Sequence, residues 1–207
     1  MEQNQQTCQI QKQNYHIVFT YGTLKKGYYN HKFIKDAVFV TENCYTDALQ
    51  EEKYTILIDK KNYVPFLYKI NSLTQKNPDI IQQIQDNIVP VQGELYIVND
   101  EQLKQLDILE GIPTYYDRFI ENFIIKPQNQ QELQQIENKF EEFGLKDQIQ
   151  NLDQSLQNEE IKPIKVKAYY YLSQQNLDER YVVEKNECFF NYTLEQHKKY
   201  VPKHLRE

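Results

Sequence analysis

The chain has 207 residues, a hydrophobic fraction of 40% and a formal net charge of −6 at pH 7. This length is sufficient for one domain with a sizeable buried core. The acidic balance argues against nucleic acid as the main partner, because phosphate binding requires a basic surface, and no apolar stretch approaches the roughly 18 residues that a membrane-spanning helix needs.

The beginning of the chain is polar and low in complexity. Residues 1–14 are rich in glutamine and asparagine, which predicts a disordered tail followed by a single domain over residues 15–207. The tail lacks the basic-then-apolar layout of a secretory signal. Three cysteines, Cys8, Cys44 and Cys188, have no metal-ligand spacing and cannot form a complete disulfide framework. We therefore expect free thiols and a cytoplasmic location.

Strand patterns dominate the rest of the chain. Segments rich in β-branched and aromatic residues predict strands over residues 16–21, 37–40, 54–59, 64–70, 89–98, 116–125 and 166–172. Asn77 as cap and Pro78 at the first helical position add a short helix over 77–87. Few helices, no strand–helix alternation and no glycine-rich phosphate loop together predict an α+β fold with a mixed, barrel-like sheet.

A second, better-defined helix is predicted directly after the strand 89–98. Either Asn99 or Asp100 supplies its N-terminal cap. Its apolar stripe consists of Leu103, Leu106 and Leu109. Gly111 and Pro113 are the residues expected to end it.

The segment 126–163 is rich in glutamine and contains two amphipathic patterns. Apolar residues recur at helical spacing in both: Leu133, Ile136, Phe140 and Phe143 in the first, and Leu145, Ile149, Leu152 and Leu156 in the second. Gly144 separates the two patterns, which predicts a helical hairpin inserted into the domain. The segment is either an arm that binds a protein partner, a hairpin packed on its own domain, or a half-ordered loop.

A glycine stops the first predicted strand. After Tyr21 and Gly22, the backbone N–H groups of the next residues, Thr23 and Leu24, are left without ladder partners. A turn of this kind can direct several donors at one anionic or carbonyl oxygen. The alternative interpretation is an ordinary turn after a strand.

An acidic residue occupies the predicted C-terminus of the second helix. Glu110 precedes Gly111, where the negative end of the helix dipole favours the protonated carboxyl. If the position is also shielded from water, the pKa of Glu110 rises toward neutrality, as a general acid–base requires. The alternative is an exposed surface glutamate. Asp107, one helical turn earlier, either shares the site or has a structural role as a helix-capping or surface group, and the structural role is expected.

Several motifs follow one another along the chain: Tyr-Gly-Thr-Leu-Lys at 21–25 with Gly27, Asn30 and His31, Val-Pro-Phe-Leu at 64–67, Val-Gln-Gly-Glu-Leu-Tyr at 91–96, Leu-Asp at 106–107 with Leu109, Glu110 and Gly111, and Tyr116 with Arg118. In order and spacing they resemble the motifs of γ-glutamylamine cyclotransferases and their γ-glutamyl cyclotransferase relatives. Ala-Tyr-Tyr-Tyr at 168–171 resembles the last core strand. The resemblance covers about residues 16–125 and 164–172.

Two segments depart from the family's pattern. Residues 126–163 are longer than the expected connection, and the stretch from Ser173 onward matches poorly. The tail 192–206 is a candidate cover for the substrate pocket. Its two histidines, His197 and His204, are expected to be surface residues rather than ligands.

The resemblance implies a γ-glutamyl cyclotransferase-like fold and assigns roles to particular residues. Glu110 matches the catalytic acid–base. The loop that forms the substrate cavity corresponds to Tyr21, Gly22, Thr23 and Leu24. Tyr171 matches a tyrosine that contacts substrate, with Tyr169 and Tyr170 as neighbouring alternatives.

The implied enzyme is a γ-glutamylamine cyclotransferase of lyase or acyltransferase type. It would release 5-oxoproline and a free amine such as lysine from γ-glutamyl-ε-lysine, a step of isopeptide degradation, with no metal or other cofactor. Thr23 resembles the amine-specific branch, because other branches more often have Ser there. The alternatives are a cyclotransferase for γ-glutamyl amino acids or glutathione, a non-catalytic binding relative, and an interaction protein that uses residues 126–163.

Overall fold

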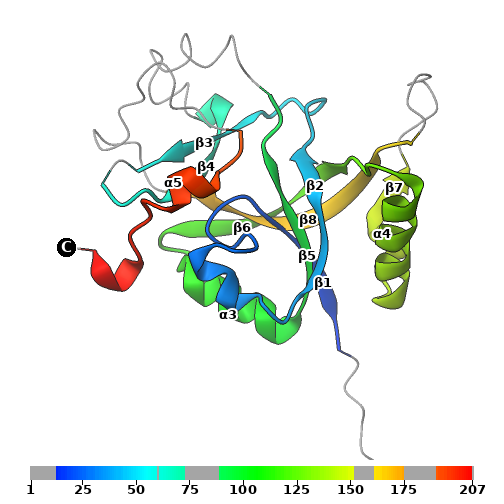
Figure 1. The fold of residues 1–207 in the computed structure, drawn as a ribbon, viewed down its shortest axis with the longest axis horizontal. Helices are drawn as coiled ribbons and strands as arrows, with labels where there is room; N and C mark the ends of the chain where they lie inside the picture. Colours follow the sequence, from blue (N-terminus) through cyan, green and yellow to red (C-terminus); the bar gives the residue numbers. More distant parts are fainter. Residues whose placement is uncertain (1–12, 60, 73–88, 152–160, 175–189, 207) are drawn as a thin grey trace, which may run out of the picture.

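The main feature of the computed structural model, which describes residues 13–59, 61–72, 89–151, 161–174 and 190–206, is a closed β-barrel (Figure 1). The strands of its sheet are β1 (Tyr15–Thr20), β2 (Val38–Thr46), β5 (Gln92–Asn99), β6 (Tyr116–Ile125), β7 (Ile149–Asn151) and β8 (Ile164–Ser173). They are hydrogen-bonded in the order β1-β5-β2-β6-β8-β7. Strand β1 also pairs in parallel with β8, at Val18 and Tyr169. This pairing closes β1, β5, β2, β6 and β8 into a barrel and confirms the predicted barrel-like α+β fold.

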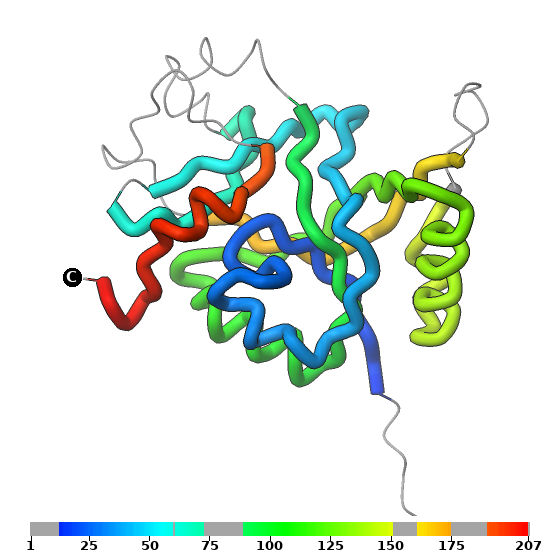
Figure 2. Tube along the Cα trace, in the orientation of Figure 1, coloured from blue at the N-terminus to red at the C-terminus, as the bar shows by residue number. Residues whose placement is uncertain are grey.

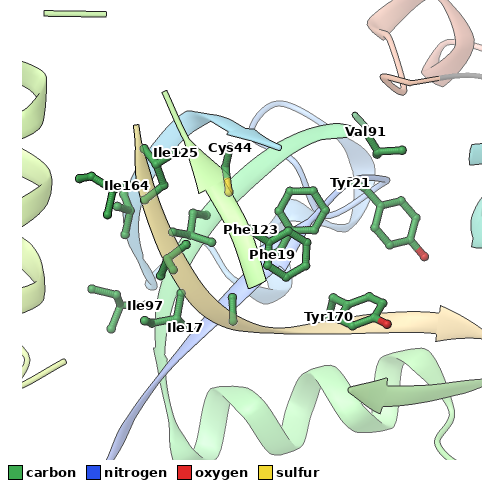
Figure 3. Close-up of a cluster of buried hydrophobic side chains, with 14 of the residues drawn as sticks. Ile17, Phe19, Tyr21, Cys44, Val91, Ile97, Phe123, Ile125, Ile164 and Tyr170 are labelled. Carbon is green, nitrogen blue, oxygen red and sulfur yellow. The ribbon is translucent and has the colours of Figure 1, made fainter. Parts of the chain in front are cut away.

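Aromatic and aliphatic side chains fill the barrel interior (Figure 3). Phe19 and Phe123 stack at its centre with ring centroids 4.2 Å apart. Cys44 is fully buried beside them, and this burial raises the pKa of its thiol. Because side chains alternate along a strand, Phe19 enters this interior while its neighbour Val18 packs into a second cluster under a helix.

A separate two-stranded hairpin packs against the barrel. It consists of β3 (Tyr54–Ile58) and β4 (Pro65–Lys69) in antiparallel pairing. Ile56 and Leu67 are fully buried in the same cluster as the barrel interior. The hydroxyls of Tyr54 and Tyr170 lie 3.2 Å apart and join the hairpin to β8.

Helix α3 (Asp100–Glu110) follows β5 as predicted. The structure selects Asn99 as its cap: the Asn99 side chain accepts from the N–H of Gln102, and the Gln102 side chain accepts from the N–H of Asn99. This reciprocal capping box stabilises a helix start by about 1 kcal/mol. Gly111, with φ of 68°, ends the helix in the left-handed conformation that glycine adopts without steric cost.

All seven predicted strands are present, and two of them differ from the predicted bounds by more than two residues at one end. Strand β2 continues past the predicted end at Val40 to Thr46. The sequence pattern stopped early because register shifts next to Thr41 and Cys44 interrupt the simple alternation of polar and apolar residues. Strand β5 begins at Gln92 instead of Val89. The N–H of Val91 there donates to the Thr46 side chain and not to the ladder.

The segment after β6 corrects one prediction. Helix α4 (Gln130–Glu142) confirms the first amphipathic pattern, and its Ile136 and Phe140 are buried in the barrel cluster. The prediction of a second helix is wrong over residues 145–151, where a 3-10 turn (Lys146–Gln148) leads into β7. Pairing of Ile149 with Val166 satisfies the backbone through the sheet, so apolar spacing that also suits a helix is overridden by tertiary contacts.

Some predicted elements lie outside the described residues: the helix at 77–87, the remainder of the second amphipathic pattern at 152–160, and the tail as far as residue 12. In the part of the chain that the structure describes, no helix has both the length and the hydrophobicity to span a bilayer.

The C-terminal strap, residues 190–206, crosses the molecule between the β3–β4 hairpin and the loop after β1 (Figure 2). It contains α5 (Leu194–His197) and a 3-10 turn, η5 (Lys203–Leu205). The N–H of Val201 donates to the Asn62 carbonyl at 2.9 Å, and the N–H of Tyr29 donates to His197 Nε2 at 2.8 Å. The strap is therefore fastened on both sides.

Candidate active site

A cavity of about 690 Å³ lies where the loop after β1 meets the end of α3, the β3–β4 hairpin and the strap. All six residues predicted for the site line it: Tyr21, Gly22, Thr23, Leu24, Glu110 and Tyr171. Cavities of this size accommodate small organic ligands. The fold thus brings three distant parts of the sequence to one space.

The loop after β1, residues 22–24 (the donor loop), lines this cavity and has backbone N–H groups with no hydrogen-bond partner in the described part of the chain. The N–H of Lys25 donates to the Gly22 carbonyl at 3.2 Å and closes a turn. Among the hydrogen bonds between described residues, none uses the N–H groups of Gly22, Thr23 or Leu24. A Cβ on Gly22 would lie 2.9 Å from Pro65 Cγ. Glycine therefore lets the donor loop approach the hairpin closely.

Side chains of the turn η1 (Tyr29–Phe33) hold the loop in place. Asn30 Nδ2 donates to Thr23 Oγ1 at 2.8 Å, so the Thr23 hydroxyl can direct its own proton elsewhere, including to a ligand. His31 Nδ1 lies 3.1 Å from the Leu24 carbonyl. Since a carbonyl only accepts, this contact assigns the proton to Nδ1. Asn30 and His31 belong to the motif seen in the sequence, and these contacts explain their presence.

Glu110 is the last residue of α3 and lies half-buried on the cavity wall. Desolvation by burial raises the pKa of its carboxyl from 4.5 to about 7. The predicted rise toward neutrality is thus present, with burial as its cause. The neighbouring Tyr21 is also affected, because burial and then the charge of Glu110 raise the pKa of its phenol.

Tyr171 is the tyrosine of its strand that lines the cavity, which decides among the three candidates. Tyr170 faces the barrel interior and Tyr169 lies under the Arg118 guanidinium, 4.8 Å from its ring centroid. The Tyr171 hydroxyl donates to Asp107 Oδ1 at 2.8 Å. Burial, followed by this hydrogen bond, raises the pKa of Tyr171, so the phenol stays protonated.

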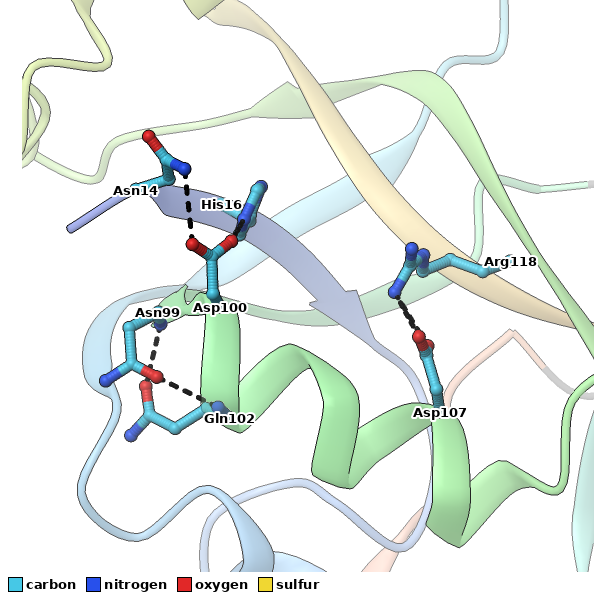
Figure 4. A network of polar contacts seen from close by, with 7 residues as sticks. All are labelled: Asn14, His16, Asn99, Asp100, Gln102, Asp107 and Arg118. Carbon is cyan, nitrogen blue, oxygen red and sulfur yellow. Dashed lines mark hydrogen bonds and ion pairs between the residues drawn. The ribbon is translucent and has the colours of Figure 1, made fainter. Parts of the chain in front are cut away.

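Asp107 acts behind the cavity wall. Its carboxylate accepts from Arg118 Nη1 at 2.7 and 2.6 Å (Figure 4). The same carboxylate also accepts from the Tyr171 hydroxyl. Asp107 itself does not line the cavity. The expectation of a structural role therefore becomes specific: Asp107 orients Tyr171.

The buried carboxylate of Glu94 holds the chain just after the donor loop. Glu94 Oε2 accepts from the N–H of Lys26 and from the Tyr96 hydroxyl, both at 2.7 Å. Next to it, a Cβ on Gly93 would lie 2.4 Å from the Thr20 carbonyl oxygen. Only glycine permits β1 and β5 to approach this closely where the loop leaves the barrel.

The hairpin and the strap supply cavity residues that the sequence analysis did not identify. Asp59, Asn62, Pro65 and Phe66 come from the hairpin, and Tyr200, Lys203, His204 and Arg206 come from the strap. The tail that was predicted as a cover thus contributes four residues to the cavity lining. His204 is exposed at the cavity edge, whereas His197 is half-buried among aromatic rings.

Comparison with known proteins identifies relatives of this architecture. The family model described as "Gamma-glutamyl cyclotransferase, AIG2-like" matches residues 18–134. Gamma-glutamylaminecyclotransferase C of Danio rerio is 31% identical over 103 residues, which are 50% of this chain and 59% of that protein. The gamma-glutamylaminecyclotransferase of Homo sapiens is 27% identical over 104 residues, again 50% of this chain and 59% of that protein. The match thus spans less than two thirds of either relative.

A solved structure shares the fold. The crystal structure of an AIG2-like protein from Mus musculus has a TM-score of 0.56, with 19% identity, 93% of this chain covered and 99% of that chain covered. The family match takes in more than half of this chain, including the donor loop and Glu110, and ends before Tyr171 and the strap. The chain belongs to the γ-glutamyl cyclotransferase, AIG2-like family.

Proposed function

We propose that the protein is a γ-glutamylamine cyclotransferase that converts γ-glutamyl-ε-lysine-type compounds into 5-oxoproline and a free amine. The observation that carries the proposal is one cavity lined both by a carboxyl of pKa about 7 and by three residues whose backbone N–H groups have no hydrogen-bond partner among the described residues. Family membership supports the reaction class. Two relatives named gamma-glutamylaminecyclotransferases support the amine as leaving group.

The reaction is an intramolecular aminolysis. The α-amino nitrogen of the γ-glutamyl group attacks its own γ-carbonyl carbon, a C–N bond forms, and the bond to the departing amine breaks. No water is consumed. Because a curled substrate holds nucleophile and carbonyl together, the attack is effectively unimolecular, and oriented groups reach effective molarities of about 10⁵–10⁸ M.

Glu110 is the group that moves the proton. The attacking amine must lose a proton, and the departing nitrogen must gain one because it cannot leave as an amide anion. An ionised Glu110 takes the first proton and delivers it to the second nitrogen. A carboxyl whose pKa lies near the working pH serves both steps, and such catalysis contributes roughly 10²–10⁴-fold in rate.

The remaining cavity groups bind and orient the substrate. The N–H groups of Gly22, Thr23 and Leu24 hold the α-carboxylate of the glutamyl unit or the oxyanion that develops on the γ-carbonyl, and a donor to an oxyanion is worth about 3 kcal/mol. Tyr171 contacts the substrate as a neutral phenol.

The proposal is tested by measuring 5-oxoproline release from γ-glutamyl-ε-lysine by mass spectrometry. Wild type should release 5-oxoproline, and Glu110→Gln should abolish release without loss of the folded state. Glu101→Gln, an exposed position on the same helix, is the matched control and should keep full activity. Full activity in Glu110→Gln would show that Glu110 is not the general acid–base.

Two other outcomes distinguish the alternatives. If wild type is inert on γ-glutamyl-ε-lysine but cyclises γ-glutamyl amino acids or glutathione, the substrate class changes and the reaction remains. If it cyclises none of these compounds, the protein is a non-catalytic relative that uses the cavity for binding.

A further inference from the structure

The strap carries basic side chains to the outer part of the cavity. Lys203 and Arg206 line the cavity from the strap, and Lys32 lines it from η1. Lys32 and Lys203 are exposed and mark the mouth of the cavity. At its opposite, reacting end, Tyr21 is buried and Glu110 is half-buried. The cavity thus has a shielded reacting end and a cationic mouth.

Within the described parts of the chain, these three cations form no ion pair. Lys32 Nζ lies 4.3 Å from the Tyr29 ring centroid, and Lys203 Nζ lies 5.1 Å from the Tyr115 ring centroid. Arg206 Nε donates to the Val201 carbonyl at 2.9 Å. Their positive charges are therefore available to a ligand.

The carboxylates of the cavity do not neutralise this mouth. Asp59 is buried and already accepts from the N–H of Lys61 and from the N–H and Nδ2 of Asn62. Glu110 has a raised pKa and belongs to the reacting end. In a chain with a formal net charge of −6, a cavity mouth with three cations that form no ion pair among the described residues is a local reversal of charge that attracts anionic groups.

We propose that Lys32, Lys203 and Arg206 form a subsite for a carboxylate carried by the departing amine. This inference rests on the proposed cyclotransferase function and refines its substrate class: conjugates of amines that bear a carboxylate, such as lysine, are preferred over conjugates of simple amines. The geometry follows from the cavity, because a glutamyl unit held at the buried end places its leaving group toward the mouth. Arginine and lysine are the side chains that bind carboxylates through charge-assisted hydrogen bonds.

Two substrates that differ only in this carboxylate test the subsite: γ-glutamyl-ε-(Nα-acetyl-lysine) and its C-terminal amide. Wild type should have a kcat/KM at least tenfold higher for the acid than for the amide, and the preference should decrease with added salt. Lys203→Met and Lys32→Met should each lower the ratio toward one by raising KM for the acid. Lys35→Met, an exposed neighbour that does not line the cavity, should retain the wild-type ratio.

The outcomes separate the two proposals. If wild type turns over both substrates with equal kcat/KM, or if Lys203→Met and Lys32→Met leave the ratio unchanged, the subsite is wrong while the cyclotransferase function stands. If wild type turns over no γ-glutamyl compound, the function fails, and calorimetry with Nα-acetyl-lysine and its amide then tests the subsite alone. Tighter binding of the acid, lost in Lys203→Met, would support the subsite; equal binding would overturn it.

Discussion

The hydroxyl of Tyr171 donates a 2.8 Å hydrogen bond to Asp107, which lies one helical turn before Glu110 on the same helix. One side of α3 therefore both carries the proposed acid–base and fixes the tyrosine opposite it. Arg118 completes the contact by donating to both oxygens of Asp107. The carboxylate is held in one orientation, and so is the phenol.

Asp107→Asn should lower kcat/KM about tenfold, because an amide binds Tyr171 and Arg118 less strongly than a carboxylate does and a charged hydrogen bond is worth about 1.5–3 kcal/mol. In a Tyr171→Phe background the same change should have little additional effect, since the two residues act through one contact. Steady-state kinetics of the single and double variants measure this coupling.

The matched control for that cycle is Asp100→Asn. Asp100 lies at the other end of α3, where it contacts His16 at 2.7 Å (Figure 4). Its substitution should leave kcat/KM within twofold of wild type. If the effects of Asp107→Asn and Tyr171→Phe on the activation free energy for kcat/KM simply add, Asp107 does not act by positioning Tyr171.

Glu110 should make the stability of the protein depend on pH. Its pKa is raised in the folded state, so its contribution to the free energy of unfolding is fully present below about pH 4.5 and is lost as pH rises through 7. Glu110→Gln should remove this pH-dependent loss of stability, because a glutamine side chain does not ionise. From pH 4.5 to 8, the free energy of unfolding of Glu110→Gln relative to wild type should rise by about 2–3 kcal/mol, at about 1.4 kcal/mol per pKa unit and with some screening by solvent. Urea denaturation at several pH values measures the difference; a constant difference would mean that Glu110 titrates normally.

The activity should follow the same ionisation. Below pH 7, kcat/KM should fall at least tenfold per pH unit, because only the ionised Glu110 accepts the proton of the attacking amine. The substrate amine, with an ordinary pKa of about 7.7–8.0, steepens this limb. Initial rates of 5-oxoproline release between pH 5 and 9 provide the profile, and rates independent of pH from 5 to 7 would exclude the proposed base.

Gly93→Ala should destabilise the fold by about 1–3 kcal/mol, the usual cost of overpacking. The added Cβ would lie 2.4 Å from the Thr20 carbonyl oxygen and 2.6 Å from the Phe19 ring. Gly144→Ala is the comparison, because its Cβ would meet no atom within 4 Å and the cost arises from the positive φ of 68° alone. Thermal unfolding should place Gly93→Ala below Gly144→Ala, and the reverse order would mean that β1 and β5 separate without strain.

Local sequence patterns were sufficient for the existence of the strands and for α3, whereas the roles expected for the loop after β1 and for Glu110 came from the family resemblance. The cap Asn99, the terminating Gly111 and the acid between them form a continuous segment whose structure follows from nearest neighbours in the chain. The segment 145–151 could not be predicted in this way, because pairing with β8 determines its conformation. Lys203 and Arg206 were missed for a related reason: their position depends on the docking of the strap at Asn62 and Tyr29.

The parallel contact between Val18 and Tyr169 has a consequence for how the protein is made. Strand β1 is synthesised well before β8, the partner whose pairing closes the barrel. Pairings between residues so far apart in sequence form slowly, because a long loop must close before they contribute. During synthesis the first strand therefore waits with an open edge, a state in which unpaired strands are prone to aggregate.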